Sequence, residues 1–287
     1  MLKKFKKNKN INPFYIRGFQ RSGTNWACNL CNLHPDINCT GEFHFEELFE
    51  GFNKTINKNH GLLSRKPTAF TAQYYNFIEN TIRHYSKNHI VCGDRTPTSL
   101  YSCYIPNRKY ILIQRDGRDA LVSWLYHLFR MDHKFGPYTE EKKLKFQKDQ
   151  NYFEVNKKEL LNNHWVKKIA KNWSNRVNYD LKFIKEVEAK SIKAEVMFIK
   201  YEELLLDTEN IRNELYNFLD CSPDKAKGLN KLTSASFKKH DPNSHYRYGK
   251  AGRWKEYFTT PQLKLFNTVA NSGLDLHKQA KTRIIRS

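Results

Sequence analysis

Residues 13–26 read PFYIRGFQRSGTNW, and this stretch indicates the fold because an apolar run gives way to a loop with two glycines. The apolar run Phe14-Tyr15-Ile16 predicts a strand, and Gly18 followed by the Ser22-Gly23-Thr24 turn predicts a loop that opens a helix. Three further apolar runs, each followed by a long segment with helical spacing, predict strands at His89–Cys92, Tyr110–Gln114 and Val196–Lys200. Strands that alternate with helices indicate an α/β fold, a parallel β-sheet flanked by helices on both faces.

The loop between the first strand and helix has the outline of a phosphate-binding loop. A Walker A loop places Lys directly after its second glycine and then Ser or Thr for magnesium, whereas this chain has Thr24 and Asn25 at those positions. Magnesium-dependent nucleotide hydrolysis is therefore disfavoured. Backbone N–H groups, a helix N-terminus and the Arg21 cation can still hold an anion there. The alternative is an ordinary strand-to-helix turn.

Two more segments suggest anion binding. QRDGRDALVSW (residues 114–124) follows the strongest strand, and Arg115 lies at the carboxyl end of that strand, where open α/β sheets bind ligands. Ser123, about two helical turns further on, could join Arg115 on one phosphate. Asp116 and Asp119 are expected to cap the helix start. The third segment, RYGKAGRWK (residues 247–255), is a basic loop with glycines.

Length and composition limit the class of protein. A chain of 287 residues with 39% hydrophobic residues can bury a sizeable core, and we see no linker that divides it. The net charge of +21 suits an anionic partner, although a genome bias towards Lys and Asn explains it equally well. We expect residues 132–163 to form a solvated, partly mobile excursion, because they are highly charged.

The cysteines and the N-terminus indicate a cytoplasmic location. The basic start lacks the apolar segment of a signal peptide, and no run is long enough for a transmembrane segment. The six cysteines are then expected to be thiols. Cys28 and Cys31 have C-x2-C spacing, but no second pair follows at zinc-ribbon distance, so no metal site is predicted.

Together, the three anion-binding segments resemble the sulfotransferase superfamily, which uses 3′-phosphoadenosine 5′-phosphosulfate (PAPS). RSGTNW resembles the 5′-phosphosulfate loop of that family (KSGTTW or RSGTT), QRDGRDALVSWLYH its 3′-phosphate element, and RYGKAGRWK its RKGxxGxWK segment. KYEEL at residues 200–204 and SASF before Lys238 are also similar to family segments. The resemblance implies a P-loop-like, single sulfotransferase domain over residues 13–275, after a basic, disordered leader (1–12) and before a basic C-terminal tail (276–287).

The resemblance also implies roles for individual residues. It assigns the 5′-phosphosulfate to Arg21, Ser22, Gly23, Thr24 and Asn25. It assigns the 3′-phosphate to Arg115, Ser123, Arg247 and Gly249, with Tyr248 between the last two. It assigns the adenine to Trp26, Tyr201 and Phe237. Sulfuryl transfer, like phosphoryl transfer, passes through a loose in-line transition state, so Arg21 and Ser123 are expected to stabilise charge without a metal.

The sequence offers three candidates for the catalytic base. The His that cytosolic relatives carry is replaced by Arg95 within GDRTP. In tyrosylprotein and heparan-type relatives the base is a Glu after an HPD segment, and here HPDINCTGEFHF makes Glu42 the first choice. His44 could orient or replace it, and Asp94 is the runner-up. The alternative for Glu42 is a helix-capping carboxylate.

The acceptor is left open by the sequence. SWLYHLFRMDH is similar to small-molecule sulfotransferases, whereas HPDINCTGEFHF is similar to those that act on glycans and tyrosine peptides. We expect a hydroxylated acceptor (glycan, lipid or small molecule) and no specific nucleic acid, because no RRM, OB or helix-turn-helix signature is present. The alternative function is a non-catalytic PAPS-type nucleotide or polyanion-binding protein.

Overall fold

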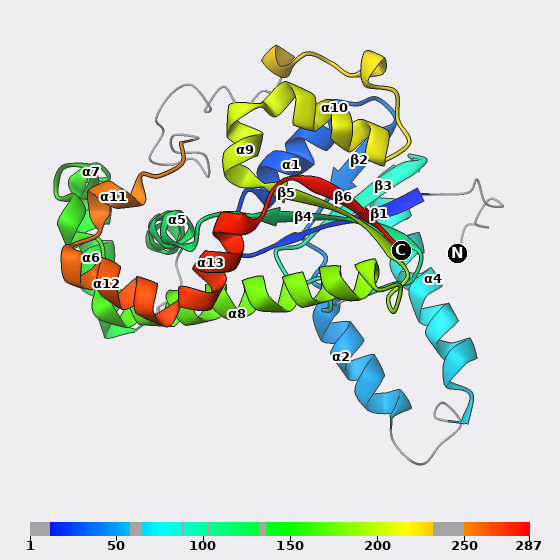
Figure 1. The fold of residues 1–287 in the computed structure, drawn as a ribbon, viewed down its shortest axis with the longest axis horizontal. Coiled ribbons are helices and arrows are strands. Elements are labelled where there is room, and N and C mark those ends of the chain that lie inside the picture. Colours follow the sequence, from blue (N-terminus) through cyan, green and yellow to red (C-terminus); the bar gives the residue numbers. More distant parts are fainter. Residues whose placement is uncertain (1–11, 58–64, 88, 103, 132–135, 232–249) are drawn as a thin grey trace.

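A computed structural model describes residues 12–57, 65–87, 89–102, 104–131, 136–231 and 250–287. Its centre is a six-stranded sheet in the order β2-β3-β1-β4-β5-β6 (Figure 1). Neighbouring strands are parallel, except that β6 runs antiparallel to β5. The strands are β1 (Asn12–Gly18), β2 (Ile37–Thr40), β3 (Val91–Arg95), β4 (Arg108–Gln114), β5 (Ala194–Lys200) and β6 (Arg283–Arg286).

The central strands are buried on both faces because their apolar residues alternate between two clusters. In β4, Ile111 and Ile113 join the core on one face, while Tyr110 and Leu112 join the core on the other. β5 divides its side chains in the same way. Successive side chains of a strand point to opposite faces, so an uninterrupted apolar run needs cover on both sides. The fold predicted from the sequence, a parallel sheet between layers of helices, is confirmed.

Helices supply that cover. α1 (Thr24–Cys31), α9 (Tyr201–Leu206) and α10 (Thr208–Phe218) lie on one face, and α8 (Asn163–Glu188) runs along the other (Figure 1). α4 (Pro67–Tyr85) adds Ile78 and Ile82 to the core on the α8 side. α2 (Phe45–Ile56) and α4 extend together from the sheet, and the ring of Phe52 stacks on Tyr74 with centroids 4.3 Å apart.

A third cluster lies beside the sheet and is built almost wholly from helices. It packs α8 against the elements α5 (Gly117–Arg130), α6 (Pro137–Lys148), α7 (Tyr152–Val155), α11 (Trp254–Tyr257), α12 (Thr260–Val269) and α13 (Asn271–Gln279). Phe146 of α6 and Phe153 of α7 are buried in it, as is Leu160 after the short 3₁₀ turn Lys157–Glu159. The prediction that residues 132–163 form a solvated excursion is therefore wrong over its described part. A few large apolar side chains anchor these helices, and most of their other described positions are exposed or half-buried.

The sequence missed two strands at the ends of the sheet. β2 has only four residues, and β6 lies within the segment expected to be a basic tail. β6 pairs with β5, with Ile285 opposite Val196, so residues 283–286 form an edge strand. Two short 3₁₀ turns, Pro223–Lys225 and Leu229–Lys231, follow α10. Within the described ranges, no helix is long and apolar enough to span a membrane.

Candidate active site

The phosphate-like loop follows β1 and leads directly into α1. Its turn is closed by the Ser22 N–H, which donates to the Phe19 carbonyl at 3.1 Å. Arg21 and Gly23 adopt left-handed backbone conformations, with φ of 67° and 102°. Gly23 is the N-cap of α1, and no side chain of the described residues caps this helix end. Successive turns of this kind at a helix N-terminus direct N–H groups and the positive end of the helix dipole towards an anion.

A buried hydroxyl in this loop has no hydrogen-bond partner among the described residues. Ser22 is fully buried, and its Oγ makes no hydrogen bond to any residue that the structure describes. Thr24 is also buried, whereas Asn25 is partly exposed. Buried polar groups are nearly always hydrogen-bonded, so an unsatisfied hydroxyl calls for a specific reason. A bound anion would provide its partner.

Arg21 connects the loop to α5. Its Nε donates to Ser123 Oγ at 3.2 Å, although the two residues are 102 positions apart. Arg115, at the end of β4, donates from Nη1 to the Arg21 carbonyl at 3.3 Å. The structure therefore brings together Arg21, Ser123 and Arg115, three of the residues that the sequence predicts as phosphate ligands. Arg21 contacts both of the others, and these contacts leave the prediction that Arg115 and Ser123 share one phosphate as it was.

Tyr201 lies at the centre of this arrangement. The Arg115 guanidinium carbon lies 4.5 Å from the centroid of the Tyr201 ring. A Cβ atom at Gly23 would collide with Cδ2 and Cε2 of the Tyr201 ring, so only glycine fits there. Arg115 also donates from Nη2 to the Lys250 carbonyl at 3.4 Å, while its buried Nε lacks a partner among the described residues. This arginine therefore touches all three sequence segments and retains an unused donor.

Asp119 joins the second and third segments, a role the sequence did not reveal. Its buried carboxylate accepts from the N–H groups of Gly252 at 2.6 Å and Trp254 at 2.9 Å. Burial raises the pKa of Asp119. Asp116 caps α5 as predicted, by accepting from the Arg118 N–H at 2.9 Å. Asp119 lies in the first turn of α5, where a carboxylate stabilises the helix start as predicted, but it makes no capping hydrogen bond because its oxygens accept from a loop 133 residues away.

Two more side chains hold the backbone of Arg115 and Asp116 in place through hydrogen bonds. Trp173 of α8 donates from Nε1 to the Arg115 carbonyl at 3.0 Å. Glu202 accepts from the Asp116 N–H at 2.9 Å, and burial raises the pKa of this carboxyl. Trp173 belongs to no motif, whereas Glu202 lies in the KYEEL segment; α8 and α9 are brought beside the β4 loop by the packing of the fold.

The proposed adenine contacts are only partly described. Trp26 and Tyr201 lie in the same hydrophobic cluster, and each keeps about 6% of its surface exposed. Four predicted cofactor ligands lie outside the described residues: Phe237, Arg247, Tyr248 and Gly249.

The candidate bases have very different surroundings. Glu42 forms an ion pair with Arg95, and its Oε2 lies 3.3 Å from His44 Nε2. His44 Nδ1 lies 2.8 Å from Glu46 Oε1, and this contact raises the pKa of His44. The Glu42 and His44 side chains are 35% and 54% exposed, so both remain accessible to an acceptor. His44, rather than Glu42, occupies the N-cap of α2.

Asp94 is placed in the core instead. Its side chain is 1% exposed, and it lies 2.8 Å from Arg17 Nη1 and accepts from Thr96 Oγ1 at 2.8 Å. A carboxylate held in a buried ion pair is poorly suited to accept a proton from an acceptor in solution. No group of three or more His, Cys, Asp or Glu residues within the described ranges could hold a metal ion.

The chain matches the family model described as "Sulfotransferase domain" over residues 12–279. No curated protein matches it. Similar solved structures include mouse sulfotransferase SULT7A1 complexed with PAP, with 19% identity over 94% of this chain and 89% of that chain at a TM-score of 0.49. A sulfotransferase from Alicyclobacillus acidocaldarius has 16% identity over 95% and 100% of the two chains, with a TM-score of 0.46. The sulfotransferase domain from the curacin biosynthetic pathway has 17% identity over 92% and 98%, with a TM-score of 0.49.

Proposed function

The chain belongs to the sulfotransferase family, and we propose that it transfers a sulfuryl group from PAPS to a hydroxyl group of its acceptor by in-line displacement. The observation that carries this proposal is the convergence of Arg21, Ser123 and Arg115 on the loop that opens α1. Two cations and a helix N-terminus at one point suit a ligand with several anionic groups.

The unsatisfied groups of the site fit such a ligand. The buried Ser22 hydroxyl and the Arg115 Nε both lack partners in the described structure, and each would be satisfied by a phosphate or sulfate oxygen. Gly23 leaves room for the Tyr201 ring, and Tyr201 in turn supports Arg115. We propose that the loop holds the 5′-phosphosulfate and that Arg115 and Ser123 hold the 3′-phosphate.

The role of Arg21 in this scheme is electrostatic. Its guanidinium keeps its proton at any physiological pH, because the pKa of arginine is above about 12. It can therefore offset charge that builds on the departing phosphate oxygen, but it cannot serve as a proton donor. The hydrogen bond to Ser123 fixes the direction of its side chain.

We propose Glu42 as the base that takes the acceptor proton. Its exposure and its contacts with Arg95 and His44 place a fixed carboxylate at the end of β2, beside the carboxyl ends of the parallel strands. His44 would orient Glu42 or share the proton. The burial of Asp94 against Arg17 makes it the weakest of the three candidates.

Transfer of labelled sulfate from PAPS, screened over sugars, lipids, phenols and tyrosine peptides, tests the function directly. Glu42→Gln should preserve the fold and the affinity for adenosine 3′,5′-bisphosphate while turnover falls by about 10²–10⁴-fold. Glu47→Gln, which changes an exposed carboxylate in the first turn of α2, is the matched control and should leave turnover nearly unchanged. An inactive His44→Asn variant beside an active Glu42→Gln variant would move the base to His44. Nucleotide binding without transfer to any acceptor would indicate a non-catalytic binding protein.

A further inference from the structure

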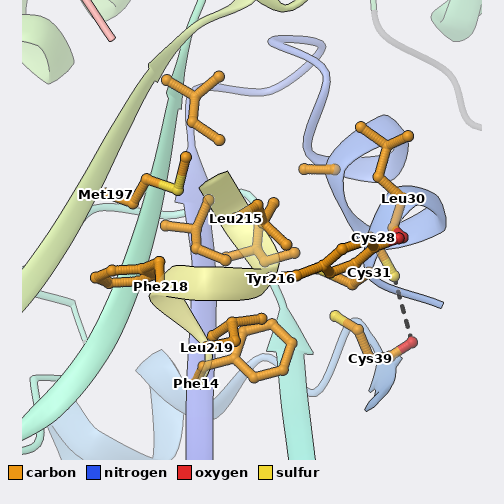
Figure 2. Close-up of a cluster of buried hydrophobic side chains, with 14 of the residues drawn as sticks. Phe14, Cys28, Leu30, Cys31, Cys39, Met197, Leu215, Tyr216, Phe218 and Leu219 are labelled. Carbon is orange, nitrogen blue, oxygen red and sulfur yellow. Dashed lines mark hydrogen bonds between the residues drawn. The ribbon is translucent and has the colours of Figure 1, made fainter. Parts of the chain in front are cut away.

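Cys28 and Cys31, the C-x2-C pair, take no part in the candidate active site. They lie in a group of buried thiols in the hydrophobic core. Cys28 and Cys31 are on α1, and Cys39 is on β2, within the hydrophobic core of that face (Figure 2). Cys221, after α10, belongs to the same core, and none of these four residues is in a disulfide. Spacing in the sequence suggests a pairing of Cys28 with Cys31, but the tertiary structure offers a different partner.

Cys28 and Cys39 are in direct contact. The Cys28 thiol donates to the Cys39 carbonyl at 3.3 Å (Figure 2). Asn32 holds the two elements together: its Nδ2 donates to the Cys39 carbonyl at 2.9 Å and its Oδ1 accepts from the Cys39 N–H at 2.7 Å. Asn32 Nδ2 also lies 3.8 Å from Cys28 Sγ. The end of α1 and strand β2 are therefore held together at Cys39, with the Cys28 sulfur against the Cys39 backbone.

Cys31 is a poorer partner for Cys28. Residues three apart on a helix have Cβ atoms about 5–6 Å from each other, whereas a disulfide needs about 3.5–4.5 Å. A bond between Cys28 and Cys31 would therefore distort α1. Cys31 is also fully buried, whereas Cys28 keeps 8% of its surface exposed.

The two contacting thiols have complementary acidities. The hydrogen bond with Cys39 and the positive charge of Arg95 lower the pKa of Cys28, against the opposing effect of burial. Burial raises the pKa of Cys39 well above that of a free thiol. Of the two sulfurs, Cys28 is therefore the more easily ionised and the one expected to react first with an oxidant, and Cys39 is the one that resolves the product.

We propose that Cys28 and Cys39 form a reversible disulfide when the protein meets hydrogen peroxide. Cys28 gives up its proton and its sulfur attacks one peroxide oxygen; the O–O bond breaks, and the departing hydroxide takes up a proton to become water. Cys28 is then a sulfenic acid. The Cys39 sulfur attacks Cys28 Sγ, and the hydroxyl group leaves as a second water with the Cys39 proton. The two thiols have then lost two electrons to the peroxide.

This bond would connect the two elements that carry the proposed chemistry. α1 begins at the phosphate-like loop, one turn before Cys28, and β2 ends immediately before the segment with Glu42. Arg95, the ion-pair partner of Glu42, is also the cation that acts on Cys28. Cross-linking should therefore weaken nucleotide binding; this regulatory consequence rests on the proposed function, whereas the cross-link itself does not.

Hydrogen peroxide applied to the full-length reduced protein tests the cross-link. We expect four of the six cysteines to remain alkylatable after denaturation, and dithiothreitol to restore all six. Cleavage with trypsin and on the amino side of Asp36 separates a peptide with Cys28 and Cys31 from one with Cys39. Mass spectrometry should find these two peptides joined, with the loss of two hydrogen atoms.

Cys31→Ser is the matched control and should cross-link like the unmodified chain. Cys39→Ser and Cys39→Ala should both abolish the cross-link and leave Cys28 as a sulfenic acid that dimedone labels, and melting of the reduced variants checks their fold. Six alkylatable thiols after peroxide, or a Cys28–Cys31 bond in the unmodified chain, would overturn the proposal. Calorimetry with adenosine 3′,5′-bisphosphate should show weaker binding to the oxidised protein. Equal binding to both forms would refute the regulatory consequence, and failure of even the reduced protein to bind would refute the proposed function alone.

Discussion

Arg115→Ala should weaken binding of adenosine 3′,5′-bisphosphate much more than it weakens the fold. Among the described residues, the guanidinium of Arg115 makes only long hydrogen bonds, at 3.3 Å and 3.4 Å to two carbonyls, and it stacks on Tyr201. A cation–π contact is worth about 0.5–2 kcal/mol, so the free energy of unfolding should fall by only about that amount. Most of the donor capacity of this arginine is left for a ligand.

The expected loss of affinity is larger. Removing a charged partner from a buried, hydrogen-bonded pair with a phosphate costs about 2–5 kcal/mol. At about 1.4 kcal/mol per tenfold change, this corresponds to a Kd that is roughly 30-fold to several-thousand-fold higher. Isothermal titration calorimetry without divalent metal measures the change, and thermal melting of the free protein measures the fold.

Arg118→Ala is the matched control. Its guanidinium is committed to Asp116 at 2.6 Å and lies 3.9 Å from the Trp254 ring centroid, so its loss should affect the melting temperature more than the affinity. Equal affinities of the Arg115→Ala and unmodified proteins would place the 3′-phosphate elsewhere. An equal loss in both variants would mean that net charge, rather than this geometry, governs binding.

Three further changes test the structure around the site. Gly23→Ala should lower the free energy of unfolding by about 1–3 kcal/mol and should also lower nucleotide affinity, because the new Cβ would collide with Tyr201 and the backbone φ is positive. Gly51→Ala, in open space on α2, is the control and should not change the melting temperature. Asp119→Ala should lower the melting temperature and nucleotide affinity, since two backbone N–H groups of the basic loop lose their acceptor; unchanged calorimetry would separate that loop from the site. Burial lowers the pKa of His277 to about 4, so this side chain is neutral in the folded protein and its protonation favours unfolding. The stability it contributes is present above about pH 6.5 and is lost as the pH falls towards 4, by about 3 kcal/mol, and urea titrations of His277→Gln should show a correspondingly flatter pH dependence over that range.

Local patterns in the sequence determined the central sheet and the loops beside it. β1, β4 and β5 each contain a run of three or four consecutive apolar residues, and such runs can be satisfied only when both faces of the sheet are covered. The loop from Arg21 to Asn25, the end of β4 and the N-cap role of Asp116 follow equally from turn and capping chemistry, which depends on neighbours in the chain. Family membership was accessible from the same three segments.

Only the tertiary structure decided which of these local elements meet. β2 and β6 are too short to be recognised without the partner strands that supply their hydrogen bonds. Asp119 is predicted to act at the start of its own helix, because an acidic residue in the first turn usually stabilises that helix. Its buried carboxylate also accepts a hydrogen bond from the backbone of Gly252, a contact that the sequence did not reveal. Cys28 likewise contacts Cys39 rather than its neighbour in the motif, because the rise of the helix keeps residues three apart at a fixed separation while packing brings β2 against α1. Hydrogen bonds and contacts between distant residues depend on the path of the whole chain, and a local pattern contains no information about that path.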